Sequence, residues 1–334
     1  MPYFNSMFRA TPSYFYHSFP RRRDGVDPVE RGLQILHSIA DFGFVLAPEI
    51  RHWKQPNSDG TLREHHSVER RISFTQLTPR QLRKHSKRFG PFALEFEVQE
   101  LRHLGGLPVF YIPQTITSDA GASSLALTFV FQLYDCQFTM NNLHKLSSIA
   151  SSGNDLIPLC NIGDDGNVIN SYRVPSATLR DVISFIQFRT SPFHLMAGTL
   201  DGVSNLFCST DDPTDDKLLA FYREREWRII GNVARNGIVY TRNINQTEKD
   251  KLTEIDPEYW NRTISGGSHS FRRVDEILIL PSFEGNHIVH RIRRIIVPPR
   301  AVRKAKEIFE SANLAVKVVS SRQVCFQSLF DASI

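Results

Sequence analysis

Two glutamates separated by one residue, Glu224 and Glu226, carry the clearest chemical potential in this sequence. They lie in FYREREWRII, residues 221–230, whose apolar end indicates a strand. Because side chains alternate along a strand, Glu224 and Glu226 are expected to share a face with Arg228, with Arg225 on the other face. Two carboxylates beside a guanidinium predict either a surface ladder of ion pairs or the acidic end of an active site.

Two further predicted strands carry side chains suited to binding a ligand. Residues 14–19, YFYHSF, place His17 among aromatic residues, where a histidine serves either as a packed core residue or as a ligand contact. Residues 71–76, RISFTQ, place the hydroxyls of Ser73 and Thr75 on one strand face. By themselves these two hydroxyls indicate no particular chemistry.

A basic helix is predicted after the second of these strands. Thr78 and Pro79 suit the N-cap and the first helical position, and Gly90 suits the end. Helical spacing then gathers four cations on one stripe: Arg80, Arg83, Lys84 and Lys87. Such a stripe is either a solvated face or a surface that binds phosphate groups.

The elements that must position these residues alternate between helix and strand. Apolar residues recur at helical intervals from Val29 to Ala40, and Gly43 suits the C-cap of that helix. Strands are predicted at 92–96 and 109–112, whereas residues 151–170, rich in Gly, Asn and Asp, are predicted to be a loop.

The C-terminal part gives the plainest pattern, a helix at 299–312 between strands at 292–297 and 315–319. We therefore expect a single α+β domain over residues 1–334. Within it we expect a helical and loop insertion at 120–215 and a C-terminal strand–helix–strand element at 271–320.

Composition narrows the class of protein. The 334 residues are 41% hydrophobic and carry 40 basic against 35 acidic residues, a net charge of +5, which suits an anionic partner without requiring one. The four cysteines form no C-x-x-C pair, so we predict no metal site and reduced thiols in the cytoplasm. We expect no signal peptide and no membrane association. The motifs of P-loop, Rossmann, zinc-protease and α/β-hydrolase sites are missing from the sequence.

Several blocks of this chain resemble the AbiGi-type abortive-infection proteins of bacterial phage defence. They are YFYHSF, the helix that exits through DFGF, SFTQLTPRQLRKHSKRFGPFALEF, LPVFYI, FYREREWRII, DEILILP and IRRIIVP, in order over about residues 14–320. Residues 120–215 contain no such block. The resemblance implies a cytoplasmic bacterial protein with a protein partner, as one half of a toxin–antitoxin pair.

A looser resemblance is to the ADP-ribosyltransferase fold, a mixed sheet core here carrying helical and loop insertions. That fold orders a His or Arg strand, a Ser/Thr strand and a late Glu-x-Glu strand, and here His17, Ser73 with Thr75, and Glu224 with Glu226 follow that order. The middle block reads Ser-Phe-Thr where the Glu-x-Glu transferases have Ser-Thr-Ser.

That resemblance implies NAD as substrate and no metal. Glu226 is expected to stabilise the oxocarbenium-like charge on the nicotinamide ribose, and Glu224 to orient or deprotonate the acceptor, a protein or nucleic acid. His17 is expected to hold the ribose. Nicotinamide is expected to stack on Tyr14 or Tyr16, and the pyrophosphate to bind Arg31 or Arg71.

Two alternatives follow from the same residues. One is a non-catalytic antitoxin or partner-binding module with a degenerate transferase-like fold, in which the glutamates only pair with arginines. The other is a nucleic-acid-binding protein or nuclease that uses the basic helix.

Overall fold

The computed structural model divides the chain into two compact units, Met1–Tyr111 with Cys208–Ile334 (unit 1) and Ile112–Phe207 (unit 2). The sequence predicts one domain over residues 1–334, with an insertion at 120–215. The structure describes the following residues: 14–21, 23, 25–56, 62–112, 129–136, 155–162, 167–187, 200, 203, 206–209, 225–231, 234–235, 238–267 and 269–324.

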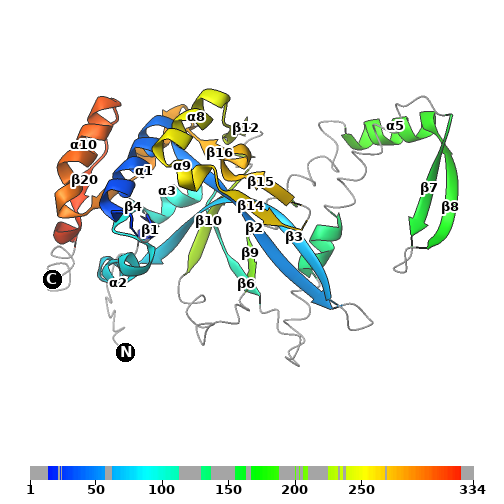
Figure 1. Ribbon diagram of the computed structural model, residues 1–334, viewed down its shortest axis with the longest axis horizontal. Coiled ribbons are helices and arrows are strands. Elements are labelled where there is room, and N and C mark those ends of the chain that lie inside the picture. The colour runs from blue at the N-terminus through cyan, green and yellow to red at the C-terminus, as the bar shows by residue number, and fades with distance from the viewer. Residues whose placement is uncertain are drawn as a thin grey trace, which may run out of the picture. The chain divides into compact units, whose positions relative to one another are not determined.

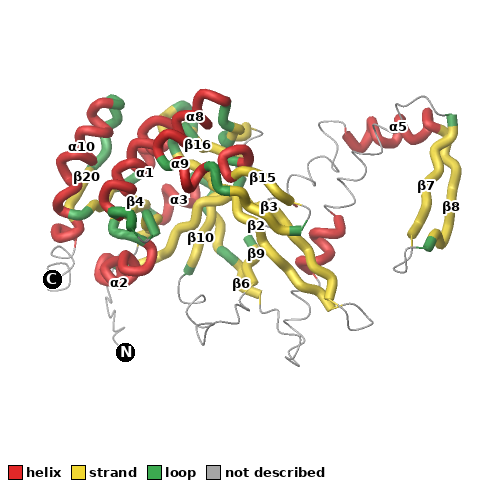
Figure 2. The backbone as a smooth tube through the Cα atoms, in the orientation of Figure 1, coloured by secondary structure: helices red, strands yellow, loops and turns green. Residues whose placement is uncertain are grey.

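Unit 1 is an α+β unit built on one large mixed sheet (Figures 1 and 2). Its strands run in the spatial order β13 (Arg242–Asn243), β16 (Leu278–Leu280), β2 (Phe44–Pro56), β3 (Leu62–Leu77), β1 (Tyr14–Phe19), β4 (Phe92–Phe96), β19 (Arg294–Val297) and β20 (Val318–Ser320). Two more strands, β10 (Glu226–Ile230) and β5 (Leu107–Pro108), extend it beside β3. All described pairs are antiparallel except β19 with β20, which α10 (Val302–Ser311) connects.

The sheet divides along β3. On one edge β2 pairs with β3 from Leu62 to Arg71, and β1 pairs with it from Thr75 to Leu77. β10 pairs with β3 from Arg71 to Thr75 on the opposite edge. Residues 72–74 of β3 therefore have no partner in the registers of β1 and β2, and these two strands diverge at that point.

One face of the sheet carries the main hydrophobic core. Phe44, Phe74 and Phe92 point into it and pack with α1 (Pro28–Phe42), α3 (Val98–His103) and α10. Gly32 lets α1 approach β4 closely, because a Cβ at residue 32 would lie 2.2 Å from the Phe92 ring. α1 starts at Asp27, whose side chain accepts from the Val29 amide, and ends at Gly43 with φ of 78°, as its sequence predicts.

The opposite face of the same sheet carries the smaller clusters. Leu82 of α2 (Pro79–Phe89) packs with Tyr16 and Ile296. Trp260 of α9 (Pro257–Trp260) and Leu252 of α8 (Gln246–Ile255) pack over Ile279. Helices therefore cover both faces of the sheet.

Short elements complete unit 1. They are the pairs β6 (Phe110–Ile112) with β9 (Phe207–Ser209), β11 (Ala234–Arg235) with β12 (Ile238–Val239), β14 (Thr263–Gly266) with β15 (His269–Arg272) and β17 (Ser282–Phe283) with β18 (Asn286–His287), and the 3₁₀ turns η1 (Arg273–Glu276), η2 (Ile288–Arg291) and η3 (Pro299–Ala301).

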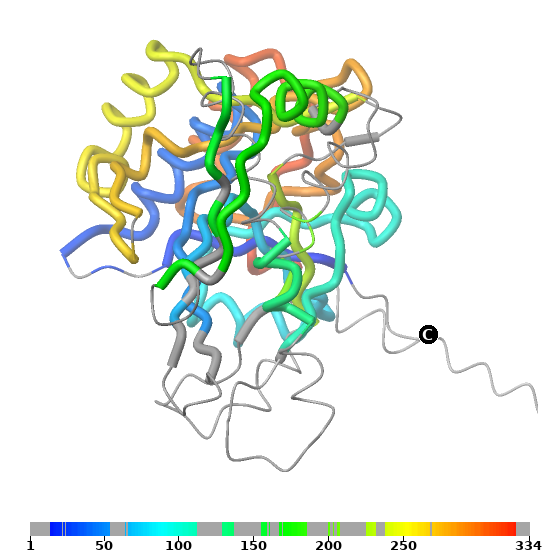
Figure 3. Tube along the Cα trace, turned by 90° about the vertical axis from the view of Figure 1, so that its right-hand side faces the viewer, coloured from blue at the N-terminus to red at the C-terminus, as the bar shows by residue number. Residues whose placement is uncertain are grey.

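Unit 2, in green in Figure 3, contains a hairpin where the sequence predicted a loop. β7 (Leu156–Ile162) pairs with β8 (Val168–Pro175), and α5 (Ser176–Gln187) follows. Ile157, Leu179 and Ile183 form its buried cluster, and residues 129–136 are helical. The loop prediction for 151–170 was wrong because the Gly and Asp residues that suggested it, GDDG at 163–166, fall between the two strands.

Candidate functional site

Glu226 begins β10, the strand that lies between β3 and β5. The preceding residue, Arg225, has a φ of 43°, a left-handed conformation that costs a non-glycine residue about 1 kcal/mol or more. The turn at Arg225 therefore starts the strand abruptly at Glu226, and such local backbone strain is found preferentially at functional sites.

Three side chains hold the Glu226 carboxylate. The Tyr111 hydroxyl donates to its Oε2 at 2.8 Å, and Arg228 donates from Nε to its Oε1 at 3.0 Å. Ser73 on the neighbouring strand also hydrogen-bonds to it. Burial by itself raises the pKa of Glu226, but the charge of Arg228 and these hydrogen bonds outweigh it and bring that pKa to about 2. Glu226 is therefore ionised at neutral pH.

A ladder of charged side chains continues from Glu226 along the same face of β3 and β2. Arg228 reaches Glu69, with Nη1 at 3.8 Å from Oε2, and Arg51 Nε lies 3.1 Å from the same oxygen. Arg71 contacts both Glu69 and Glu49. Glu69 and Arg228 are each only 1% exposed, so these ions are desolvated and depend on one another.

Arg71 is held within this charged ladder. Burial lowers its pKa, and the charges of Arg228 and Arg51 lower it further, while Glu49 and Glu226 oppose them. Two carboxylates already occupy its guanidinium. Arg71 is therefore placed to keep the ladder together, and a pyrophosphate would have to compete with Glu49 and Glu69 for it.

The alternation of β1 places His17 on the other side of the sheet. Thr75 pairs with Tyr16 on one edge and with Glu226 on the other, so these three side chains share a face. His17, one residue along, packs its ring 5.7 Å from Phe19 and 5.8 Å from Phe74. The structure therefore places His17 and the Glu226 carboxylate on opposite faces of the sheet, although the resemblance implies that both act on the nicotinamide ribose.

His17 has a different function in the fold. Its Nδ1 lies 2.8 Å from the carbonyl oxygen of Ser73, within the stretch of β3 where β1 and β2 diverge. Burial lowers its pKa, so the ring is neutral and Nδ1–H donates to that carbonyl. The histidine thus supplies a hydrogen bond that a neighbouring strand would otherwise supply.

The two tyrosines of β1 face the side that carries Glu226, but both are engaged. Tyr16 is 1% exposed, and its hydroxyl donates to Glu95 Oε2 at 2.7 Å. The Tyr14 ring meets Tyr16 edge-on, and Arg293 lies over it at 4.4 Å. Stacking of nicotinamide on Tyr16 would require Tyr16 to leave the core.

Two predicted site residues remain, Arg31 and Glu224. Arg31, in the first turn of α1, donates from Nε to Asp256 Oδ2 at 2.9 Å, so Arg31 and Arg71 are held by different carboxylates. Glu224 lies outside the described residues.

The basic helix forms as its sequence predicts. α2 starts after Thr78, whose backbone N–H donates to Gln81 Oε1 at 2.8 Å. Its four predicted cations are exposed: Arg80, Arg83, Lys84 and Lys87. Arg88 and Arg21 both lie over the Phe89 ring, at 5.1 and 5.5 Å.

Sequence reasoning missed four members of the Glu226 surroundings: Glu49, Arg51, Glu69 and Tyr111. A usable signal was the alternating charge in β2 and β3, where Glu49 and Arg51, like Glu69 and Arg71, stand two residues apart and so share a face. Tyr111 gave no such signal, because an aromatic residue in a short apolar strand is usually core.

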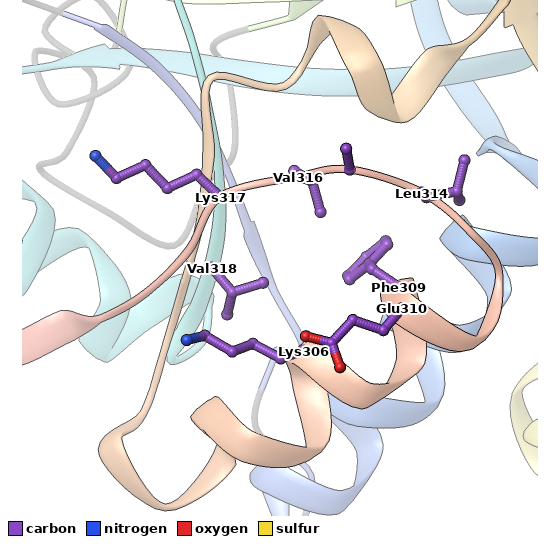
Figure 4. Close-up of a pocket in the computed structure, with 8 residues that line it drawn as sticks. Lys306, Phe309, Glu310, Leu314, Val316, Lys317 and Val318 are labelled. Carbon is purple, nitrogen blue, oxygen red and sulfur yellow. The ribbon is translucent and has the colours of Figure 1, made fainter.

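One open surface pocket lies elsewhere, between α10 and the segment that leads into β20 (Figure 4). Its lining is Lys306, Phe309, Glu310, Leu314, Ala315, Val316, Lys317 and Val318, which includes no predicted site residue. In the sheet order β19, β4 and β1 separate this edge from β3. No cluster of three His, Cys, Asp or Glu side chains suited to a metal ion occurs among the described residues.

Comparison of the chain with protein-family models, with curated proteins and with solved structures finds no match. Among the described residues, no helix is long and apolar enough to cross a membrane.

Proposed function

We propose that this protein is an NAD-using, ADP-ribosyltransferase-like enzyme of phage defence, with Glu226 as its catalytic carboxylate. The supporting observation is that Glu226 is kept ionised, with a pKa of about 2, at the strained start of β10. Cleavage of the glycosidic bond of NAD develops positive charge on the ribose, which a fixed carboxylate stabilises.

The neighbours of Glu226 support this assignment. Ser73 hydrogen-bonds to the carboxylate and Thr75 pairs with Glu226 across the strands, so the Ser/Thr strand and the Glu strand, which the resemblance places in this order along the chain, are neighbours in the sheet. The mixed sheet is consistent with the mixed sheet core that the resemblance implies. Tyr111 and Arg228 then act as positioning residues, because they fix the two carboxylate oxygens.

Incubation with labelled NAD and a phage-infected bacterial lysate tests this proposal. Wild-type protein is expected to release nicotinamide or transfer label, and Glu226→Gln to reduce this at least a hundredfold, since it removes the stabilising charge and keeps the shape. Glu307→Gln is the matched control, because Glu307 is exposed on α10 and its ion pair with Arg303, at 3.5 Å, is also exposed. Absence of both activities in wild type, or equal activity in Glu226→Gln, contradicts the proposal.

The non-catalytic alternative is supported by the ion pair between Glu226 and Arg228. Arg228 already neutralises Glu226, which is the pairing expected of an antitoxin or partner-binding module with a degenerate transferase-like site. The two hypotheses differ in one prediction. If the Glu226–Arg228 pair is only structural, Glu226→Gln lowers the stability of the protein, and wild type has no NAD-dependent activity that the variant could lose.

A nucleic-acid-binding function is favoured by a separate observation. α2 reads PRQLRKHSKRF, without an acidic residue, and its cations Arg80, Arg83, Lys84 and Lys87 are exposed. Phosphate backbones bind such surfaces with a strong dependence on salt.

A further inference from the structure

Three arginines, one before α1, one within α1 and one in η1, converge on one tyrosine of unit 1. Arg23 precedes α1, Arg31 lies in its first turn, and Arg273 begins η1. Their guanidinium carbons lie 5.7, 5.3 and 4.0 Å from the centre of the Tyr259 ring in α9. Segments distant in sequence thus place three positive charges around a single ring.

The nearby carboxylates compensate these charges only in part. Asp256 accepts from Arg31 at 2.9 Å and lies 3.8 Å from Arg23, while one oxygen of Asp256 also caps the backbone of Tyr259. Glu258 lies 3.5 Å from Arg23, but its side chain is 78% exposed, so solvent screens that pair. The charge of Glu49 also acts on Tyr259, but Arg71 already pairs with Glu49. Among the described residues, the three cations therefore face one well-placed carboxylate, Asp256.

Arg273 shows most directly that the cluster has a hydrogen-bond donor available for a further acceptor. Its Nη1 donates to the carbonyl of Tyr259 at 3.3 Å, at the weak end of hydrogen-bond distances. Its Nε is buried and has no hydrogen-bond partner among the described residues. A buried guanidinium donor without an acceptor is costly, and a bound anion supplies the missing acceptor.

We propose that Arg23, Arg31 and Arg273, gathered around Tyr259, form a binding site for the phosphate or phosphoanhydride group of a small molecule. Planar guanidinium groups bind phosphate oxygens through two parallel hydrogen bonds, and the aromatic ring holds them in place. Arg71 is a poorer candidate for this group because Glu49 and Glu69 already engage it. Assigning the group to the pyrophosphate of NAD rests on the proposed function, whereas the anion site does not.

Inorganic pyrophosphate, titrated into the full chain by calorimetry at constant ionic strength, tests the site. Arg273→Gln is expected to weaken binding roughly tenfold or more, the scale of one lost charge-assisted hydrogen bond. Arg23→Gln is the second variant in case Arg273→Gln fails to fold, because the Arg23 side chain is 25% exposed against 10% for Arg31. Arg242→Gln removes the same charge from an exposed pair with Glu248 and is expected to leave affinity unchanged.

A variant that removes a negative charge instead of a positive one shows whether the arginines bind an anion or are only structural. Asp256→Asn keeps a good N-cap for α9 but removes the carboxylate that competes for Arg31 and Arg23, so pyrophosphate binding is expected to tighten several-fold. No pyrophosphate binding by wild type, equal weakening in Arg242→Gln, or no gain in Asp256→Asn overturns the site.

The anion site and the proposed enzyme activity can be contradicted independently of each other. Glu226→Gln is expected to bind pyrophosphate like wild type. Absence of NAD-dependent activity in wild type with pyrophosphate binding intact would contradict only the proposed function, and NAD-dependent activity in wild type without pyrophosphate binding would contradict only the anion site.

Discussion

Glu226 shows how a partly buried carboxylate is kept charged. Its side chain is 16% exposed, and burial alone would favour the protonated form. Arg228, Ser73 and Tyr111 reverse that preference. The group therefore combines two properties that a catalytic carboxylate needs: a fixed position and a negative charge at neutral pH.

The depressed pKa of Glu226 predicts a specific dependence of stability on pH. Its pKa falls from 4.5 in the unfolded chain to about 2 when folded, so its contribution is complete above pH 4.5 and disappears as the pH falls toward 2. That contribution amounts to about 3 kcal/mol. The difference in free energy of unfolding between wild type and Glu226→Gln is expected to shrink by this amount from pH 6 to pH 2, as measured by urea titration.

Glu307→Gln is the control for this measurement, because it replaces an exposed glutamate of α10 by the same residue type. A wild-type-minus-Glu226→Gln difference that stays constant with pH would show that the carboxylate is not held as described.

At the scale of elements, strand pairing determines which side chains meet. The bounds of α2 and β4 were predictable because caps and periodicity are local in sequence. The face of His17 relative to Glu226 was not, since it depends on which residue of β3 stands opposite each strand. The β2–β3 pairing, ten residues long, was not predictable for a related reason: the sequence at 53–66 is polar and resembles a loop.

The exposed basic face of α2 predicts nucleic-acid binding that weakens with salt. Replacing Lys84 and Lys87 together by Gln is expected to lower the slope of log affinity against log salt by roughly 1 to 2, since each removes at most one phosphate contact. Electrophoretic or fluorescence titration with single-stranded RNA and duplex DNA at several salt concentrations measures this.

The matched control replaces two exposed lysines of α10, Lys304 and Lys306, by Gln, which removes the same charge from another helix. If wild type binds neither nucleic acid, or if both double variants change the slope equally, α2 is not a nucleic-acid surface.

At the scale of the whole molecule, each unit has its own buried cluster. Every residue of the three clusters of unit 1 comes from its two sequence segments, and Ile157, Leu179 and Ile183 form a cluster within unit 2. The blocks that suggested a known family lie in unit 1, whereas residues 120–215 carried no recognisable block. The hairpin of unit 2 was not predictable from the sequence, because pairing of β7 with β8 is not encoded in local composition.

This division predicts that unit 1 folds without unit 2. The chain leaves unit 1 after Tyr111 and returns at Cys208, and these residues belong to the paired strands β6 and β9, so a short Gly/Ser linker can join them. Replacing residues 112–207 by such a linker is expected to preserve the far-ultraviolet circular dichroism of the α+β core and one cooperative thermal transition. A broad or absent transition would show that unit 1 needs unit 2.

The central claim is that Glu226 is a catalytic carboxylate, and release of nicotinamide from labelled NAD in phage-infected lysate measures it most directly. Activity in wild type and in Glu307→Gln, with a loss of at least a hundredfold in Glu226→Gln, is the result we predict. No nicotinamide release and no label transfer by wild type, or undiminished activity in Glu226→Gln, would contradict the claim.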